Sequence, residues 1–382
     1  MKIPMSSPDI TDAERRAVQD VINTPILSMG SRIKEFEQAF CNETGAKYAI
    51  GVSSGTAGLH LCVRAAGIEA GDYVITSPFS FVASTNVLLF ENAIPVFVDV
   101  DPKTGNINPE IAADAAKNIE KYLPRTSHVA PRTLKALLPV DVFGQPANMD
   151  AINAIAAQHG LRVIEDSCEA LGATYKGRKA GTLGEFGVFA FYPNKQITTG
   201  EGGMIITNDE KAAQLMQALR NQGRAPGDTW LSHTYLGYNY RLDEMSAAIG
   251  TVQLNRLDEL LTKRETIAGW YAERLGHIPE IELPLIESNT TRMSWFVYVI
   301  RVQPGIDRDA FAKRLEAHGV PVRPYFLPIH LQPYMVERFG YREGDFPVTE
   351  DLGRRGLAIP FSGVMTEKQV EYVCKTIKDE LG

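Results

Sequence analysis

The sequence predicts an α/β protein: a large domain with a mainly parallel central sheet flanked by helices, followed by a smaller α+β domain. Short apolar runs alternate with helical patterns between residues 48 and 165, and this alternation is typical of right-handed βαβ units. Beyond about residue 280 the alternation stops, and strands and helices follow in a different order. We therefore expect a large domain over 1–250 and a smaller domain over 251–382.

The elements of the large domain can be taken in chain order. The residues at 11–14 (TDAE) form a capping box, which predicts the start of a helix. A second helix is predicted around 33–40. We expect strands at 48–52, 73–76, 94–100, 136–143 and 161–165, and helices at 59–66, 81–90, 110–134 and 149–159.

The later elements are predicted in the same way. Two apolar strands, 188–192 and 204–207, enclose a Gly-rich turn. A long amphipathic helix is predicted from 242 to about 275, because its apolar residues recur at helical spacing. The smaller domain should contain strands at 295–300 and 320–323, a helix at 309–318 and a last helix from residue 367.

Composition and charge exclude several classes of protein. A length of 382 residues with 44% hydrophobic residues is enough for a substantial core. The net charge of -7 argues against binding to nucleic acid or to a membrane surface. The four cysteines are far apart, with no CxxC pair and no His cluster at zinc spacing, so we expect reduced thiols and no metal. Because no signal-peptide core or membrane-spanning run is visible, the predicted location is the cytoplasm.

A phosphate site is predicted where the first strand turns into a helix. The six residues 53–58 (SSGTAG) hold two serines, two glycines and a threonine. Backbone N–H groups at a helix N-terminus, with hydroxyls beside them, bind phosphate well. The alternative is a plain helix cap, but a cap needs only one Ser or Thr. Gly181, Gly184 and Gly187 are spaced GxxGxxG, so they do not match the dinucleotide motif GxGxxG.

Two charged residues complete a candidate site. Lys195 follows one buried strand and precedes another; loss of water favours the neutral amine that can attack a carbonyl, although a solvated loop lysine is the alternative. Asp166 ends a strand, where it either caps a loop or presents a fixed anion. Pyridoxal phosphate needs a lysine, phosphate donors and a carboxylate beside its ring nitrogen. Phe81 or Phe79 could stack on the ring. The combination predicts a pyridoxal phosphate enzyme.

The same motifs resemble the DegT/StrS family of pyridoxal phosphate-dependent sugar aminotransferases, within the aspartate-aminotransferase-like fold (type I). The resemblance extends from about residue 5 to beyond residue 330. Its matching stretches are SSGTAG at 53–58, GD at 71–72, SFVA at 80–83, PVFVDV at 95–100, ED at 165–166, ALGA at 170–173, Lys195, TTGEGG at 198–203 and GYNYR at 237–241.

The resemblance implies a role for individual residues. Lys195 would form the Schiff base with the cofactor, Asp166 would pair with the ring nitrogen, and Phe81 would stack on the ring. The full set of cofactor-binding residues would be Gly55, Thr56, Ala57, Phe81, Asp166, Glu169, Lys195 and Asn239. Asn239 would reach the phosphate of a second subunit, which makes the enzyme a homodimer with a composite site. His330 and Arg241 are candidate substrate residues, with a structural histidine and an interface arginine as the alternatives.

Two positions depart from the family pattern. Glu169 stands where the family often has Gln, and its carboxylate would add negative charge near the cofactor. Ala190 stands where the family often has a phosphate-binding Ser. Loss of that donor would cost roughly 1.5–3 kcal/mol of phosphate affinity unless another hydroxyl replaces it.

The resemblance implies ping-pong amino transfer, through pyridoxamine phosphate, from an amino acid such as L-glutamate to a nucleotide-linked keto-sugar. A sugar dehydratase of the same family is a rival hypothesis; such dehydratases carry His in place of the lysine. Two further hypotheses are a non-catalytic regulatory member of the family and a lyase or desulfurase that acts on amino acids.

Overall fold

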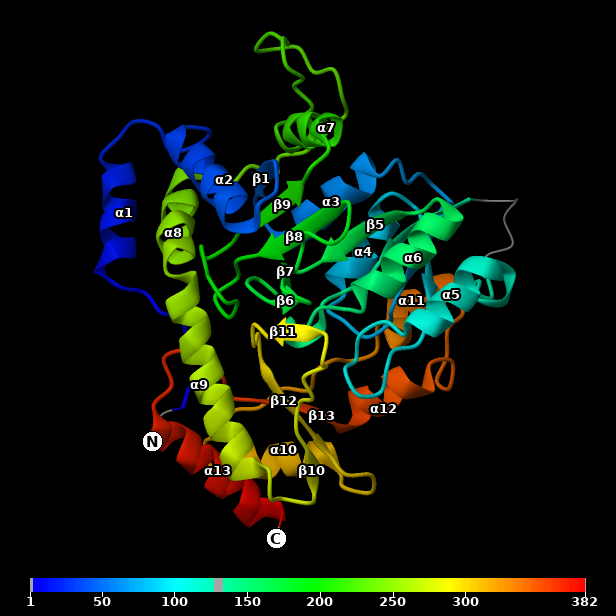
Figure 1. Ribbon diagram of the computed structural model, residues 1–382, viewed down its shortest axis with the longest axis vertical. Helices are drawn as coiled ribbons and strands as arrows, with labels where there is room; N and C mark the ends of the chain where they lie inside the picture. Colours follow the sequence, from blue (N-terminus) through cyan, green and yellow to red (C-terminus); the bar gives the residue numbers. More distant parts are fainter. Residues whose placement is uncertain (1–2, 127–132, 382) are drawn as a thin grey trace.

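A seven-stranded sheet forms the centre of the larger part of the molecule (Figure 1). The computed structural model describes residues 3–126 and 133–381. In spatial order the strands are β1 (Tyr48–Val52), β9 (Gly203–Thr207), β8 (Phe186–Ala190), β5 (Arg162–Asp166), β4 (Leu134–Leu138), β2 (Tyr73–Thr76) and β3 (Ile94–Phe97). Only β9 runs against its neighbours in this sheet, β1 and β8. The predicted mainly parallel sheet is confirmed.

Helices cover both faces of this sheet. Consecutive strand residues point to opposite faces, so that Val188 packs against the helices of one face and Phe189 against those of the other. The first face carries α3 (Gly55–Ala65), α4 (Ala83–Phe90) and α7 (Glu210–Arg220). The second carries α2 (Ser31–Thr44), α5 (Pro109–Lys117), α6 (Met149–His159) and α8 (Glu244–Asn255).

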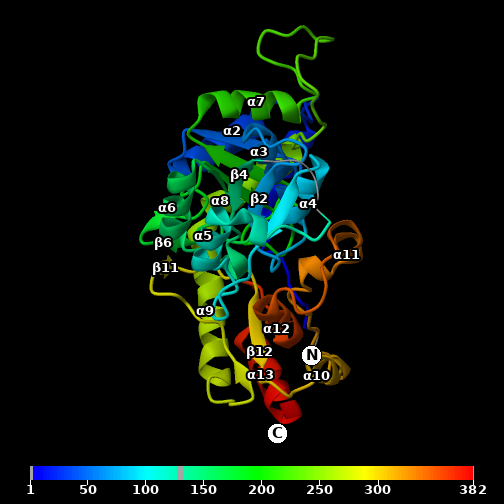
Figure 2. The ribbon, with the colours of Figure 1, turned by 90° about the vertical axis from the view of Figure 1, so that its right-hand side faces the viewer.

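A smaller antiparallel sheet lies at the other end of the molecule (Figure 2). It consists of β10 (Ile281–Glu282), β12 (Tyr298–Val302) and β13 (Gly356–Ile359), and it packs against α10 (Arg308–Ala317) and α13 (Glu367–Leu381). Between the two sheets lies a third (Figure 1), formed by β11 (Thr290–Arg292), β6 (Thr174–Tyr175) and β7 (Arg178–Lys179). The smaller part of the molecule also contains the short helices α11 (Pro333–Phe339) and α12 (Pro347–Arg355).

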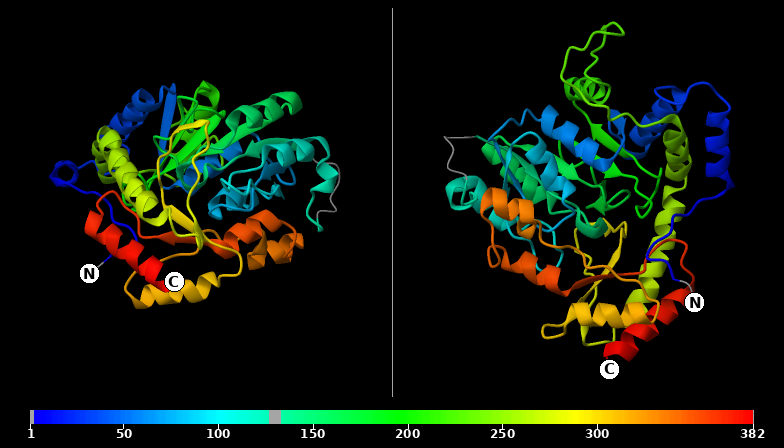
Figure 3. Two further views of the ribbon diagram at one scale, coloured as in Figure 1. Left: turned by 60° about the horizontal axis from the view of Figure 1, so that its bottom comes forward. Right: turned by 180° about the vertical axis from the view of Figure 1, so that it is seen from behind.

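One helix takes part in both cores. α9 (Leu257–Leu275) packs Leu257 and Leu261 against the large-sheet core, and Ile267 and Tyr271 against the small-sheet core. Ile3 also belongs to the small-sheet core, and both ends of the described chain lie beside it (Figures 1 and 3). The predicted division after residue 250 stays a prediction.

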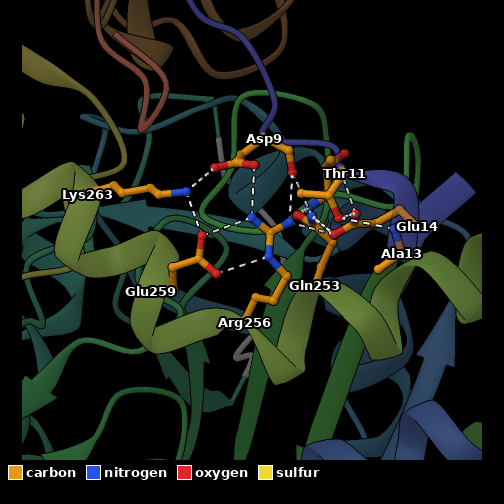
Figure 4. A network of polar contacts seen from close by, with 9 residues as sticks. Asp9, Thr11, Ala13, Glu14, Gln253, Arg256, Glu259 and Lys263 are labelled. Atoms are coloured by element: carbon orange, nitrogen blue, oxygen red, sulfur yellow. Dashed lines mark hydrogen bonds and ion pairs between the residues drawn. The ribbon is translucent and has the colours of Figure 1, made fainter. Parts of the chain in front are cut away.

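The long helix predicted from 242 is broken at Arg256, which has φ -102° and ψ 7°. Figure 4 shows the side chain of Arg256, which reaches from this break to α1 (Asp12–Ile22) and to the segment that precedes α1. Arg256 donates from Nη1 to Glu14 Oε1 (2.7 Å) and from Nη2 to Asp9 Oδ1 (2.9 Å) and Glu259 Oε1 (3.1 Å). Lys263 Nζ donates to the same Asp9 carboxylate at 2.7 Å. The N-terminal segment is thereby tied to the α8–α9 junction.

Some predicted elements are shorter than expected. The helix predicted over 110–134 is α5, which stops at Lys117 because Asn118 leaves helical dihedral angles; residues 127–132 of that prediction lie outside the described residues. The strand predicted over 320–323 supplies only a bridge between Arg323 and Ala358, since Pro321 and Pro324 have no N–H to donate.

Candidate active site

A cavity of about 430 Å³ opens where several strands of the large sheet end. β4, β5 and β8 all run toward it, as expected for ligand sites in parallel sheets. The smaller part of the molecule contributes Phe296, Tyr325 and Phe326 to its wall. The other lining residues are Ser54, Gly55, Thr56, Leu59, Phe81, Ala83, Val140, Asp166, Cys168, Glu169, Ala190, Tyr192, Asn194, Lys195, Glu201 and Gly202.

The predicted phosphate cradle lies in this wall. Ser54 caps α3, and its Oγ accepts a hydrogen bond from the Ala57 N–H at 3.0 Å. Gly55 is required for close packing, because a Cβ there would lie 2.8 Å from Ala190 Cβ and from Cys168 Sγ. Ser54, Gly55 and Thr56 face the cavity, whereas Ala57 is buried behind them. The helix N-terminus therefore presents donors to an anion in the cavity.

Lys195 lies in the turn between β8 and β9 and points into the cavity. Its side chain is 13% exposed, and Nζ lies 3.7 Å from Glu169 Oε1. Nζ also lies 3.8 Å from the centre of the Phe296 ring. The amine is therefore held between a carboxylate and an aromatic face.

Asp166 is the last residue of β5 and is buried at the cavity. Its Oδ1 accepts a hydrogen bond from the Cys168 N–H at 3.1 Å. Burial raises the pKa of this carboxyl group, while the N–H of Cys168 and the charge of Lys195 act in the opposite direction. A cation placed beside Asp166 would therefore stabilise its ionised form.

Glu169 links the lysine to the chain around it. Its Oε2 accepts a hydrogen bond from the Phe143 N–H at 2.9 Å, and its Oε1 faces Lys195. Burial raises the pKa of Glu169, and the nearby Lys195 opposes this shift. The carboxylate that departs from the family pattern is thus a direct neighbour of the amine.

Phe81, and not Phe79, faces the cavity. The Phe81 side chain lines the mouth and is 64% exposed. Phe79 is buried and packs edge-on against Phe143 and Phe326. Of the two aromatic residues left open by the sequence, only Phe81 is placed to stack on a ligand.

Besides Ala57, three predicted residues lie outside the cavity wall. Asn239 forms a backbone bridge with Asn221, and Arg241 donates to the side chain of the same Asn221 at 3.2 Å. His330 is fully buried, with Nε2 3.0 Å from Glu350 Oε1. His330 is therefore buried away from the cavity wall, as its structural alternative expects, and its contact with a substrate stays a prediction.

Asn194 and Cys168 are among the cavity residues that the sequence analysis did not single out as site residues. Asn194 directly precedes Lys195, and its buried Oδ1 has no hydrogen-bond partner within the described residues. Its amide therefore retains hydrogen-bonding capacity beside a cavity wall in which Ala190 lacks a hydroxyl. Cys168 also lines the cavity, but burial raises the pKa of its thiol well above the ordinary value, which disfavours the nucleophilic thiolate that a desulfurase needs.

Comparison with known proteins decides the family. The model of the DegT/DnrJ/EryC1/StrS aminotransferase family matches residues 8–378. The chain belongs to this family. It is 38% identical to the GDP-perosamine synthase of Caulobacter vibrioides, over 100% of this chain and 98% of that relative.

Several solved structures have the same fold. DesV of S. venezuelae matches with a TM-score of 0.88 and 30% identity, over 99% of this chain and 98% of that one. The E. coli GDP-4-keto-6-deoxy-D-mannose-3-dehydratase, solved with hydrated PLP, matches with a TM-score of 0.88 and 26% identity over 99% of each chain. The predicted family, fold type and pyridoxal phosphate cofactor are confirmed, and the protein is an aminotransferase.

The residues of the cavity fit this cofactor. A helix N-terminus with two hydroxyls can hold the phosphate, and the amine of Lys195 can bind the aldehyde. Asp166 can hold a protonated ring nitrogen, whose positive charge would stabilise the ionised form of this buried carboxyl group. Within the described ranges, no helix is long and apolar enough to cross a membrane.

Proposed function

We propose that the protein transfers an amino group from L-glutamate to the keto group of a nucleotide-linked sugar, in two half-reactions of a ping-pong cycle. The observation that carries this proposal is the meeting of Lys195, Asp166 and the α3 cradle around one cavity. The similarity to GDP-perosamine synthases supports a nucleotide sugar as the amino acceptor.

The residues of the chain then have separate tasks. Pyridoxal phosphate, when bound, supplies an electron sink for the carbon that carries the amino group. Asp166 keeps a proton on the ring nitrogen, and the hydroxyls of Ser54 and Thr56 bind the phosphate. Lys195 Nζ, which points into the cavity, would take up and return the proton that moves between the reacting carbons. Glu169, 3.7 Å away, keeps this amine oriented toward the cavity.

We also propose that the active site is completed by a second copy of the chain. Among the residues that line the cavity, three are carboxylates (Asp166, Glu169 and Glu201) and one is an amine (Lys195). A diphosphate-linked substrate needs additional positive charge. Asn239 and Arg241, which lie outside the cavity of their own chain, would serve the site of the partner.

Exposed apolar side chains support this dimer. The loop that follows α7 projects from the molecule in both Figure 1 and Figure 2. It carries Trp230, Leu231 and Leu236, which are 76%, 84% and 81% exposed. Apolar residues gathered on a projecting loop are typical of a protein interface.

The cytoplasmic location of the protein stays a prediction.

The dehydratase of the same family is the second candidate. The fold does not separate the two activities, because an aminotransferase (TlmJ of Streptoalloteichus hindustanus) and a dehydratase match the chain equally well, with TM-scores of 0.88. The presence of Lys195, where the resemblance implies His in dehydratases, favours amino transfer.

The test uses the two half-reactions separately. The cofactor-loaded enzyme is mixed with L-glutamate, and the loss of the visible absorbance of the lysine-bound cofactor is followed together with the release of the keto acid. A panel of nucleotide-linked keto-sugars is then added, and the amino-sugar product is identified by mass spectrometry. Recovery of the absorbance with one keto-sugar is expected. Formation of a deoxygenated sugar without nitrogen would show that the dehydratase assignment is the right one.

A further inference from the structure

Arg264 is a buried arginine whose hydrogen bonds converge on the turn that carries Lys195. It lies on α9 and is 4% exposed. Nη2 donates to the backbone oxygens of Asn194 (3.2 Å) and Lys195 (2.7 Å). Nη1 donates to the backbone oxygens of Trp295 (3.1 Å) and Phe296 (3.2 Å). One guanidinium group therefore joins two segments that are far apart in the sequence.

The surroundings of this guanidinium group are unusual for a charge. Its hydrogen-bond acceptors are neutral carbonyl oxygens, and its aromatic neighbour is Phe361, whose ring centre is 5.8 Å away. Burial lowers the pKa of Arg264 to about 10. Burying a charge without a counter-charge is costly. Only a planar group with several donors can reach all four oxygens at once.

The two segments joined by Arg264 meet again at the amine. Lys195 belongs to the first segment and Phe296 to the second, and Nζ of Lys195 lies 3.8 Å from the centre of the Phe296 ring. The next residue, Gln196, donates to Ser294 Oγ at 2.8 Å and also to the backbone oxygen of Glu169. The backbone of the lysine, the ring beneath its amine and the carboxylate beside it are thus held in one hydrogen-bonded unit.

We propose that Arg264 is a positioning residue for Lys195: by clamping the backbone of residues 194–195 to that of 295–296, it fixes where Nζ lies against Glu169 and Phe296. This inference rests on the proposed role of Lys195 as the residue that binds the cofactor.

The test compares Arg264→Met with Arg264→Lys and with a matched control, Arg308→Met. Arg308 is also buried and also donates to backbone oxygens, those of Gly353 (3.2 Å) and Gly356 (2.6 Å), but it lies outside the cavity wall. Both methionine variants lose hydrogen bonds to buried carbonyls and should be less stable than the wild type. Only the change at Arg264 should alter Lys195.

Three readouts report on Lys195. The first is the rate at which pyridoxal phosphate, added to the cofactor-free protein, forms a borohydride-reducible link to Lys195, measured by peptide mass spectrometry. The second is the pH titration of the visible absorbance of the loaded enzyme. The third is the split between kcat and KM for L-glutamate. In Arg264→Met we expect slower link formation, a displaced titration midpoint, and a kcat reduced by about 100-fold, the size of effect that a displacement of 1 Å causes. The KM should change less.

Arg264→Lys keeps the charge but cannot span both segments, so it should show the same changes to a smaller degree. If Arg264→Met does not fold, wild-type readouts in Arg264→Lys overturn the proposal. It is also overturned if Arg264→Met matches the wild type in all three readouts, or if Arg308→Met changes them equally. If the reduced cofactor in the wild type is found on a residue other than Lys195, the proposed function itself is wrong.

Discussion

Arg256 and Arg264 lie at the start and in the middle of the same helix, and their environments differ in kind. Arg256 is surrounded by the carboxylates of Asp9, Glu14 and Glu259, and the hydrogen bond to Glu259 is the largest of the contributions that raise its pKa. Arg264 is surrounded by backbone carbonyl oxygens, and burial lowers its pKa. The first arginine holds the start of the chain to the helix, whereas the second holds the active-site turn.

The difference predicts two separable kinds of mutational effect. Changes in the network of Arg256 should reduce the free energy of unfolding and leave the chemistry intact. Changes of Lys195 and Asp166 themselves should reduce the rate and leave the fold intact.

The largest effect is expected from Lys195→Ala. Without the amine, no covalent link to the cofactor can form and no group carries the proton, so visible absorbance of the bound cofactor and turnover should both be lost. Absorbance spectra and a transamination assay measure this, and Lys211→Ala, which changes an exposed lysine of α7, is the matched control. Residual transamination by the Lys195 variant would show that the amine of Lys195 is not required for amino transfer.

A smaller loss is expected from Asp166→Asn. The amide cannot hold a proton on the ring nitrogen, so kcat should fall by about 10²–10⁴-fold, the range of a lost acid–base contribution. Because burial raises the pKa of Asp166, replacing the charge by a neutral amide should not lower the free energy of unfolding. Steady-state kinetics and denaturant unfolding are measured on the same preparation. Unfolding at markedly lower denaturant would mean that this site is not separable from stability.

On the other side of the comparison, Glu14→Gln should affect stability. Burial would raise the pKa of Glu14, but hydrogen bonds from Thr11, Gln253 and Arg256 outweigh it and lower this pKa to about 2. A group with a lowered pKa stabilises the fold above its ordinary pKa of 4.5, and this contribution is lost as the pH falls from there toward about 2. The variant should lose about 1–3 kcal/mol at neutral pH and show a flatter decline of stability in acid.

Denaturant unfolding between neutral pH and pH 3 measures this effect, with the exposed Glu273→Gln as the control. The activity of Glu14→Gln should equal that of the wild type. A fall in kcat would show that the network around Arg256 also affects the active site. Gln253 could connect the two, because it donates to Glu14 Oε1 at 2.7 Å and accepts from the Thr198 N–H at 3.3 Å.

The smallest effect is expected from Glu259→Gln. Its carboxylate pairs with Arg256 and Lys263, but its side chain is 49% exposed. Exposed ion pairs contribute little and are screened by salt, so the loss should be less than about 1 kcal/mol and should shrink further at high ionic strength. Thermal unfolding at two salt concentrations checks this. A larger loss that persists in salt would mean that Asp9 and Glu14 depend on Glu259 for their positions.

The sequence could predict those parts of the site that local patterns define. Lys195, Asp166 and the cradle at 53–58 each stand at or just after the end of an apolar strand, so their positions follow from the alternation of strands and helices. The sequence does not show the break at Arg256. The apolar residues on both sides continue at helical spacing, and a network of tertiary contacts causes the break.

Arg264 and Phe296 could not be predicted for a related reason. Both contribute through contacts between distant segments: Arg264 with the backbone of residues 295–296, and Phe296 with Nζ of Lys195. The burial of His330 could not be predicted either. A histidine between prolines gives no indication of burial, and only the tertiary fold supplies its partner, Glu350.

The division of α9 between two cores has a mechanical consequence. Its first half packs with the large sheet and its second half with the small sheet, and Arg264 stands where the two halves meet. If one core turns against the other about this point, displacement grows with distance from the pivot. The far rim of the cavity would then swing widely while the lysine, clamped at the pivot, stays nearly still.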